Sequence, residues 1–389
     1  MSRSPLSLGG AIPVMLLRRP RYARRIGGMN TRGRDIRRRR PAGSAFGLAL
    51  AVAAGLAGCA TAGAGAEAGS GMRADAEPSP GELLVAYKGA RALGIVDTVA
   101  NREVARVPEG GVTGHEVATS PDGRLAFVPI YGDSGVGQPG SDGSRLVIVD
   151  VAARERAGEI DFGRGVRPHD PVFNARDGLL YVTTELERSV SIVDPARREL
   201  VGSVPTGQDE SHMLAISRDG RRGYTANVGP GTVSVLDLVG RETLAVVPVS
   251  ATTQRIAISA DDRFVFTADQ ARPRIAVIDA QAMRIVRWIP LPSTGFGMAP
   301  TPDGRWLVVA MPGANRVAVV DLRRDEVAHV VDVPAAPQEP LVRPDGKVVY
   351  VSCDRSRQVA AIRTSDWTVA ALIDVGEGAD GLAWAAAAD

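Results

Sequence analysis

The stretch Gly178-Leu-Leu-Tyr-Val-Thr-Thr184, followed by Ser191-Ile-Val-Asp194 and Leu200-Val-Gly-Ser-Val204, decides the fold of this chain. The pair Asp177-Gly178 opens the stretch, and polar residues separate three short runs that are rich in β-branched residues. Asp-Gly supplies the positive φ that a tight hairpin needs, and such runs are typical of β-strands. The stretch therefore predicts a small antiparallel sheet.

The same unit recurs along the rest of the chain. An apolar run that ends in Asp occurs six times, and a seventh copy ends in Arg: Gly94-Ile-Val-Asp97, Val147-Ile-Val-Asp150, Ser191-Ile-Val-Asp194, Ser234-Val-Leu-Asp237, Ala276-Val-Ile-Asp279, Ala318-Val-Val-Asp321 and Val359-Ala-Ala-Ile-Arg363. Successive copies lie 53, 44, 43, 42, 42 and 42 residues apart. Four short strands in a unit of this length are typical of propeller blades.

The two ends of the repeat array complement each other. The first copy begins at its second strand, near Leu83, and the chain ends in the strand Ala379-Asp-Gly-Leu-Ala-Trp384, which has no blade of its own. Pairing these two strands closes the ring and removes an exposed sheet edge. The sequence therefore predicts an all-β fold, a seven-bladed β-propeller over residues 81–389 closed by pairing the C-terminal strand with blade 1.

Three strands carry a family resemblance: Tyr181-Val-Thr-Thr184, Tyr224-Thr-Ala-Asn227 and Tyr350-Val-Ser-Cys353. Each follows a turn that contains Asp-Gly or its counterpart and precedes the apolar run of its unit. The pattern resembles the YVTN-repeat (YncE-like) family of seven-bladed propellers, over residues 81–389. The resemblance implies a fold and leaves the activity open. WD40 repeats are a poorer match, because no blade ends in Trp-Asp.

Charge is distributed unevenly along the chain. Residues 1–40 hold twelve Arg and one acid, Asp35, and therefore carry a formal charge of +11. Residues 41–58 hold no charge, so the chain total of +2 leaves about −9 on residues 59–389. An acidic folded region argues against nucleic-acid binding through bulk charge.

The N-terminal segment has the order of a targeting signal. Four consecutive Arg at 37–40 precede an uncharged run at 42–57, which suits the apolar region of a signal peptide better than a span of about twenty residues. The run ends in Leu56-Ala57-Gly58-Cys59, which resembles a bacterial lipobox. We interpret residues 1–58 as a signal peptide, with Met29 as an alternative start.

The lipobox resemblance implies a membrane anchor through a lipid on Cys59. Residues 59–80 are rich in Ala, Gly, Ser and Pro and are interpreted as a flexible tether. The domain beyond is expected in the periplasm or on the cell surface, and Ala60 after the Cys favours the outer membrane. We expect a monomer, whose small ligand or protein partner the sequence does not name.

Three of the four histidines fall at the starts of predicted inner strands: His115, His169 and His212, in blades 2, 3 and 4. Inner strands line the channel of a propeller, so these residues are expected at one rim. Imidazole is a common ligand of transition metals, which predicts a site for a divalent metal such as Cu, Zn or Fe. The alternative is that polar side chains solvate a wet channel mouth.

The spacing of these histidines raises a question of register. His115 and His212 each lie eight residues before a turn glycine, whereas His169 lies nine before Gly178. A slip of one residue turns a strand side chain to the opposite face. We therefore expect His169 to join the others only through a loop or a bulge.

The leading interpretation is a binding or scaffold module, and two further interpretations compete with it. Seven-bladed lactonases and muconate-type cycloisomerases are similar in architecture, and the likeness implies roles as base and oxyanion stabiliser for His115, Glu116, His212 and Arg255. A third interpretation is a cofactor-carrying propeller of the cytochrome d1 type, which rests on the supply of histidines alone.

Other features of the repeats have more ordinary interpretations. The long Gly-rich loop at 131–144 is expected on the histidine rim, either as a lid or specificity loop or as a tolerated insertion. Two Cys in 389 residues exclude a disulfide scaffold and a CxxC zinc site. Cys353 is expected to be an inert buried residue, and the recurring Asp at the strand ends are expected to cap turns.

Overall fold

The computed structural model describes residues 81–112, 114–133 and 135–387. The signal peptide, the lipobox with Cys59 and the tether, all predicted within residues 1–80, lie outside the described residues. Within the described part, no helix is long and apolar enough to cross a membrane.

The described residues form seven four-stranded antiparallel sheets, numbered here as blades 1 to 7. The first four, from inner to outer strand, are β28 (Ala379–Ala386), β1 (Gly81–Tyr87), β2 (Ala92–Asp97), β3 (Arg102–Pro108); β4 (Ala118–Thr119), β5 (Leu125–Gly132), β6 (Asp142–Asp150), β7 (Glu155–Asp161); β8 (Pro168–Phe173), β9 (Leu180–Thr184), β10 (Ser189–Asp194), β11 (Glu199–Pro205); and β12 (Ser211–Ile216), β13 (Arg222–Asn227), β14 (Thr232–Asp237), β15 (Glu242–Pro248). The other three are β16 (Ile256–Ile258), β17 (Phe264–Asp269), β18 (Arg274–Asp279), β19 (Arg284–Pro290); β20 (Met298–Pro300), β21 (Trp306–Met311), β22 (Arg316–Asp321), β23 (Glu326–Asp332); and β24 (Pro337–Val342), β25 (Val348–Cys353), β26 (Gln358–Arg363), β27 (Thr368–Asp374). Short 3-10 turns follow the second strands of three blades: η1 (Glu185–Glu187), η2 (Pro312–Ala314) and η3 (Asp354–Ser356).

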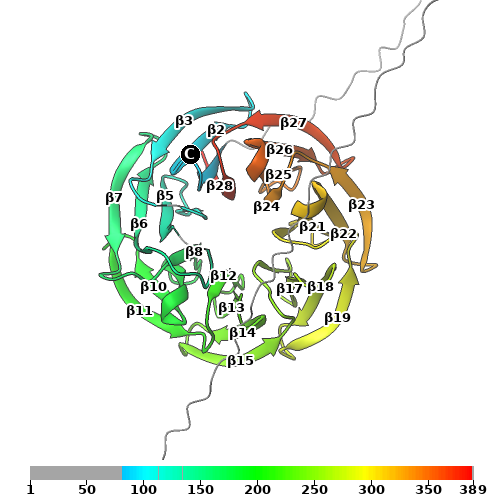
Figure 1. Ribbon diagram of the computed structural model, residues 1–389, viewed down its shortest axis with the longest axis horizontal. Helices are drawn as coiled ribbons and strands as arrows, with labels where there is room; N and C mark the ends of the chain where they lie inside the picture. Colours follow the sequence, from blue (N-terminus) through cyan, green and yellow to red (C-terminus); the bar gives the residue numbers. More distant parts are fainter. Residues whose placement is uncertain (1–80, 113, 134, 388–389) are drawn as a thin grey trace, which may run out of the picture. The chain divides into compact units, whose positions relative to one another are not determined.

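The sheets stand around a central channel, with outer strands such as β7 and β15 on the circumference (Figure 1). The last strand, β28, is the inner strand of blade 1 and pairs with β1, with Leu83 opposite Trp384. This confirms the predicted seven-bladed propeller and its closure by the C-terminal strand.

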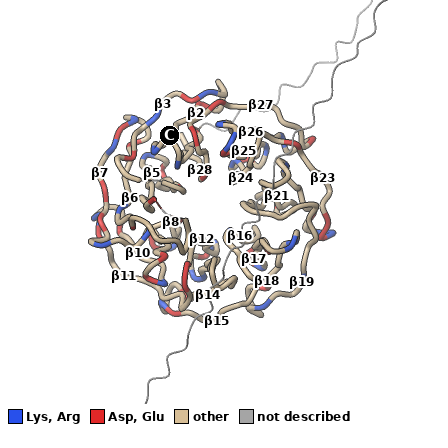
Figure 2. The backbone as a smooth tube through the Cα atoms, viewed as in Figure 1, with Lys and Arg blue, Asp and Glu red and all other residues tan. Residues whose placement is uncertain are grey.

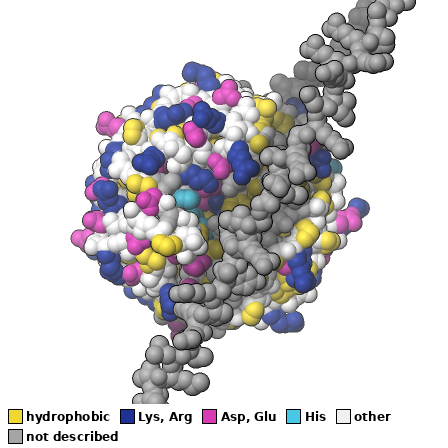
Figure 3. Space-filling view, viewed as in Figure 1, with side chains coloured by type: hydrophobic (Ala, Val, Ile, Leu, Met, Phe, Trp, Pro, Cys, Tyr) yellow, Lys and Arg dark blue, Asp and Glu magenta, His cyan; other side chains and the backbone are white. Residues whose placement is uncertain are grey.

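Burial explains the sequence pattern of the blades. The second and third strands are covered on both faces by neighbouring blades, so β9 and β13 are buried almost throughout. One core cluster, for example, joins Leu84 and Ile95 of blade 1 to Val128 of blade 2. Many charged residues lie instead on the outer strands and turns (Figure 2). A few large apolar residues, such as Val99 and Leu372, are exposed. On the face drawn in Figure 3, hydrophobic side chains are scattered among charged ones.

The hairpin turns explain why His169 lies nine residues before its turn glycine and His212 only eight. In blade 4 the Gly220 N–H donates to the Ser217 carbonyl at 2.8 Å, whereas in blade 3 the Gly178 N–H donates to the Asn174 carbonyl at 2.9 Å. The blade 3 turn is therefore one residue longer, and His169 and His212 each lie five residues before the first residue of their turns. The extra residue sits in the turn, so His169 and His212 occupy equivalent places. Both lie at a bulge, as expected for His169: the pairing shifts between Pro168 and Pro171 in β8 and between Ser211 and Met213 in β12.

The recurring Asp residues behave as expected. Asp194 Oδ1 accepts backbone N–H groups from Ala196 and Arg197 at 2.9 and 3.0 Å. Asp237 and Asp279 cap their turns in the same way. These carboxylates are structural.

Candidate functional site

The starts of the inner strands gather polar side chains at one end of the channel, here called the channel mouth. His169 and His212 belong to β8 and β12, His115 and Glu116 precede β4, and Arg255 precedes β16. The Asp-Gly turns follow the inner strands and so lie at their other ends. The structure thus collects every sequence-predicted site residue of the propeller in one region.

The three histidines converge. Their ring centres lie 3.6 Å apart for His169 and His212, which are tilted by 33°, and 5.2 Å apart for His115 and His169. The phenol ring of Tyr131, at the end of β5, meets all three edge-on at 5.2 to 6.2 Å. Blades 2, 3 and 4 therefore share one cluster of aromatic rings.

Several imidazole nitrogens in this cluster have no hydrogen-bond partner among the described residues. They are both ring nitrogens of His169, which is 1% exposed, and Nδ1 of His212, which is 2% exposed. Burial holds the pKa of both imidazoles well below the usual range, so both rings are neutral at pH 7. A buried polar group left without a partner costs about 1–3 kcal/mol.

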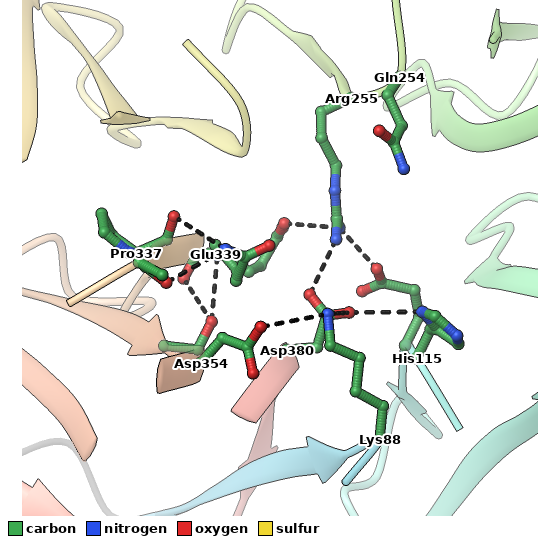
Figure 4. Close-up of polar contacts among 12 residues, drawn as sticks. Lys88, His115, Gln254, Arg255, Pro337, Glu339, Asp354 and Asp380 are labelled. Atoms are coloured by element: carbon green, nitrogen blue, oxygen red, sulfur yellow. Dashed lines mark hydrogen bonds and ion pairs between the residues drawn. The ribbon is translucent and has the colours of Figure 1, made fainter. Parts of the chain in front are cut away.

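Next to the imidazoles, Arg255 reaches across the channel mouth to three carboxylates (Figure 4). Its Nη1 lies 2.6 Å from Glu116 of blade 2 and 2.9 Å from Glu339 of blade 7. Its Nη2 lies 3.0 Å from Asp380 on β28. One guanidinium from blade 5 thus links three other blades, and its side chain is only 4% exposed.

Asp380 also holds a second cation and a histidine. Its Oδ2 lies 3.1 Å from Lys88 Nζ and 3.5 Å from His115 Nδ1 (Figure 4). Burial opposes ionisation of Asp380, but contact with His115, Arg255 and Lys88 outweighs it and lowers the pKa of this carboxyl below its usual range. Asp380 is therefore the ionised centre of the network.

The other carboxyls at the channel mouth bind protons more tightly. Burial raises the pKa of Glu116 well above its usual range in spite of the neighbouring Arg255. Burial also raises the pKa of Glu339 and of Asp170 to about 7. Glu339 and Asp170 therefore exchange protons near neutral pH, whereas Asp380 stays ionised.

The long loop of blade 2 is tied to this rim. Glu185, which is 3% exposed, accepts hydrogen bonds from the Tyr131 hydroxyl and from the Gly137 N–H, the latter at 3.0 Å. Arg167 bridges Glu185 and Asp142 at 3.3 and 2.7 Å. The predicted placement of the 131–144 loop beside the histidines is thereby confirmed for its described residues.

The imidazoles do not form a ready-made metal site. Two imidazoles that share one tetrahedral ion, with metal–nitrogen distances of about 2.0–2.1 Å, place their ring centres about 5 Å apart. His115 and His169 have this separation, whereas His212 stacks too closely on His169. In the part of the chain that the structure describes, no group of three or more His, Cys, Asp or Glu is arranged to hold a metal ion.

The remaining candidates lie apart from this chemistry. Cys353 is fully buried and burial raises the pKa of its thiol to about 12, in keeping with an inert residue. The fourth histidine, His329, lies on the outer strand β23 beside Trp306 and Trp367.

The sequence reasoning missed Tyr131 as a wall of the cluster, and it missed Lys88 and Glu185. Tyr131 could have been flagged, because it is the first residue of the long loop predicted at 131–144. Nothing in the local sequence marks Lys88 or Glu185, whose roles arise from contacts between blades.

Comparison with known proteins gives one family. The family model described as "Cytochrome D1 heme domain" matches residues 174–378, which is more than half of the chain. No curated protein matches the sequence.

Solved structures similar to this one include Kuenenia stuttgartiensis hydrazine synthase, with 20% identity, a TM-score of 0.62, and coverage of 77% of this chain and 99% of that chain. Another is a functionally unknown protein from Desulfotomaculum acetoxidans DSM 771, with 13% identity, a TM-score of 0.65, and coverage of 78% and 98%. At these identities the likeness is one of fold.

Proposed function

The chain belongs to the cytochrome D1 heme domain family, and we propose that it is a binding module that holds a transition-metal ion at the channel mouth. The proposed ligands are His115, His169 and His212. The observation that carries the proposal is the set of buried imidazole nitrogens without partners.

The protonation state of the cluster supports a metal ligand role. Metals bind the neutral imidazole, and burial keeps His169 and His212 neutral at pH 7. A metal ion would satisfy nitrogens that the protein leaves without partners.

The proposed ligand atoms follow from the hydrogen bonds of the other nitrogens. His115 Nδ1 faces Asp380, which leaves the lone pair on Nε2. His212 Nε2 lies 3.1 Å from the side-chain amide of Gln254. If the oxygen and nitrogen of that amide are exchanged, the Gln254 oxygen accepts a hydrogen bond from His212 Nε2–H. The lone pair of His212 is then on Nδ1 and is available to a metal ion. A three-imidazole site further requires His212 to swing off the face of His169.

The family name implies a haem, but these residues fit a haem less well than they fit a single metal ion. Imidazole is a suitable axial ligand of haem iron, but a haem also carries carboxylates that need cations. Arg255, Lys88 and Arg167 are already paired with carboxylates. The stacked rings of His169 and His212 leave no gap for a macrocycle between them. We therefore propose a metal ion held directly by protein side chains.

Binding is preferred over lactonase-like catalysis for a related reason. The roles of base and oxyanion stabiliser were predicted jointly for His115, Glu116, His212 and Arg255, of which Arg255 is the permanent cation. Both of its terminal nitrogens already contact carboxylates. A guanidinium in this state is poorly placed to stabilise a developing negative charge.

We further propose the setting in which the module works. The lipobox resemblance supports a lipid anchor at Cys59 and a location in the periplasm or on the cell surface, with the outer membrane favoured. The Tyr-containing strands after the Asp-Gly turns support a place among YVTN-repeat propellers. We expect a monomer that does not bind nucleic acid.

Calorimetric titration of the purified, chelator-treated chain with Zn²⁺ and Cu²⁺ tests the metal proposal. We expect one ion per chain, and at least tenfold weaker binding after His169→Ala. The matched control is His329→Ala, which removes the histidine outside the cluster. Absence of stoichiometric binding, or equal binding by the His169→Ala protein, would overturn the proposal.

A further inference from the structure

The segment that carries His115 has little support from its own blade. His115 and Glu116 precede β4, which has only two residues, Ala118 and Thr119. On the N-terminal side, an isolated bridge joins Gly114 to Ile130. The backbone of His115 therefore lies outside the regular ladder of blade 2 and must be fixed from elsewhere.

The closing strand β28 supplies that support through two consecutive residues. The Gly381 N–H donates to the carbonyl oxygen of His115 at 2.9 Å. The Asp380 carboxylate lies 3.5 Å from His115 Nδ1. A Cβ at Gly381 would lie 2.6 Å from Glu116 Cα and 2.7 Å from the His115 oxygen, so only glycine permits this approach. Backbone and side chain of His115 are thus both held by the C-terminal strand.

Asp380 is itself immobilised. Its Oδ1 contacts Arg255 Nη2 at 3.0 Å, its Oδ2 contacts Lys88 Nζ at 3.1 Å, and its side chain is 3% exposed (Figure 4). A carboxylate fixed by two cations presents its remaining lone pair to His115 in one orientation. It can set both the ring angle and the tautomer of that imidazole.

Building on the metal site proposed above, we propose that Asp380 is the positioning residue for His115. It accepts the Nδ1–H, fixes Nε2 as the metal-binding atom, and makes the C-terminal strand part of the site. Carboxylates that accept the second N–H of a metal-bound histidine orient the ring and raise its basicity, and their loss costs about 10–100-fold in metal affinity.

The test compares the chelator-treated full chain with its Asp380→Asn variant. Zn²⁺ affinity is measured by calorimetry and the coordination of Co²⁺ by its visible absorption. We expect about 10–100-fold weaker binding and an altered Co²⁺ spectrum. Asp332→Asn is the control, since Asp332 lies on β23 and its side chain is 83% exposed.

A double-mutant cycle separates positioning from general damage to the fold. If Asp380 acts through His115, Asp380→Asn weakens Zn²⁺ binding in the wild-type background but changes it less than twofold in the His115→Ala background. Equal losses in the two backgrounds would overturn the inference.

The outcomes for the two proposals are distinguishable. If the wild-type chain binds no metal, the proposed function fails. If it binds metal and Asp380→Asn leaves both affinity and spectrum unchanged, the function stands and the positioning role fails. Circular dichroism checks folding, and if Asp380→Asn does not fold, Asp380→Glu keeps the charge beside Arg255 and Lys88 while displacing the carboxylate from His115. Unchanged binding by this second variant would also overturn the inference.

Discussion

Replacing Arg255 with Met should destabilise the propeller more than any other single change at the channel mouth. The substitution keeps much of the side-chain volume and removes a guanidinium that contacts Glu116, Glu339 and Asp380. All three carboxyls would then lose the cation they share, while remaining mostly out of water.

The size of the effect follows from the cost of breaking a buried ion pair. Removing one partner leaves an uncompensated buried charge, at about 3–5 kcal/mol. An unfolding entropy of about 2.1 cal/mol/K per residue, over roughly 300 residues, converts each kcal/mol into a Tm change of about 1.6 °C. We therefore expect Tm to fall by about 5–8 °C at pH 7.

The loss of stability should also depend on pH. Without Arg255, the folded-state pKa values of Glu116 and Glu339, already raised by burial, rise further. A carboxyl whose pKa is higher in the folded than in the unfolded protein lowers the stability of the fold as pH rises from the unfolded-state pKa to the folded-state pKa. The Tm difference between wild type and Arg255→Met should thus be larger at pH 8 than at pH 5.

Differential scanning calorimetry of the chelator-treated proteins at both pH values measures these effects. A second variant, Arg255→Met with Glu116→Gln and Glu339→Gln, should recover part of the lost Tm by removing two of the stranded charges. A Tm for Arg255→Met within 2 °C of wild type at both pH values would refute the account of Arg255 as a buried hub.

Four further outcomes are expected. Since burial raises the pKa of Glu339 to about 7, this carboxyl lowers stability as pH rises from about 4.5 to 7, and Glu339→Gln should flatten that slope in denaturant titrations at a series of pH values. Tyr131→Phe removes a donor to the buried Glu185 and should cost about 1–3 kcal/mol in urea unfolding, whereas a change below 0.5 kcal/mol would contradict this assignment. Mass spectrometry of the chain from its native host should find a lipid on Cys59, and a panel of sugar lactones should remain unhydrolysed between pH 5 and 9.

The fold could be predicted because its signals are local and repeated. Each hairpin needs an Asp-Gly or similar turn, each central strand needs continuous apolar residues, and both recur about every 42 residues. Closure was predictable from an unpaired strand at each end of the array. The convergence of His115, His169 and His212 followed from their common place at the strand starts.

The details of the site could not be predicted, because they depend on distances across the ring. Arg255 is recognisable as a rim residue, but only the diameter of the channel decides that its guanidinium reaches blades 1, 2 and 7 together. The register of His169 was uncertain because counting residues to a glycine cannot reveal which part of a hairpin holds an insertion. The contact between Tyr131 and Glu185 joins the end of β5 to η1 of the next blade, a pairing that the sequence alone does not reveal.

The dependence of His115 on Asp380 and Gly381 also sets an order of events during biosynthesis. Translation proceeds from the N-terminus, so the three histidines are made more than 160 residues before the strand that fixes the first of them. Until that strand has been synthesised and has joined blade 1, His115 lacks both of its supports. At the proposed metal site, binding by a fixed His115 would therefore begin only after the ring has closed.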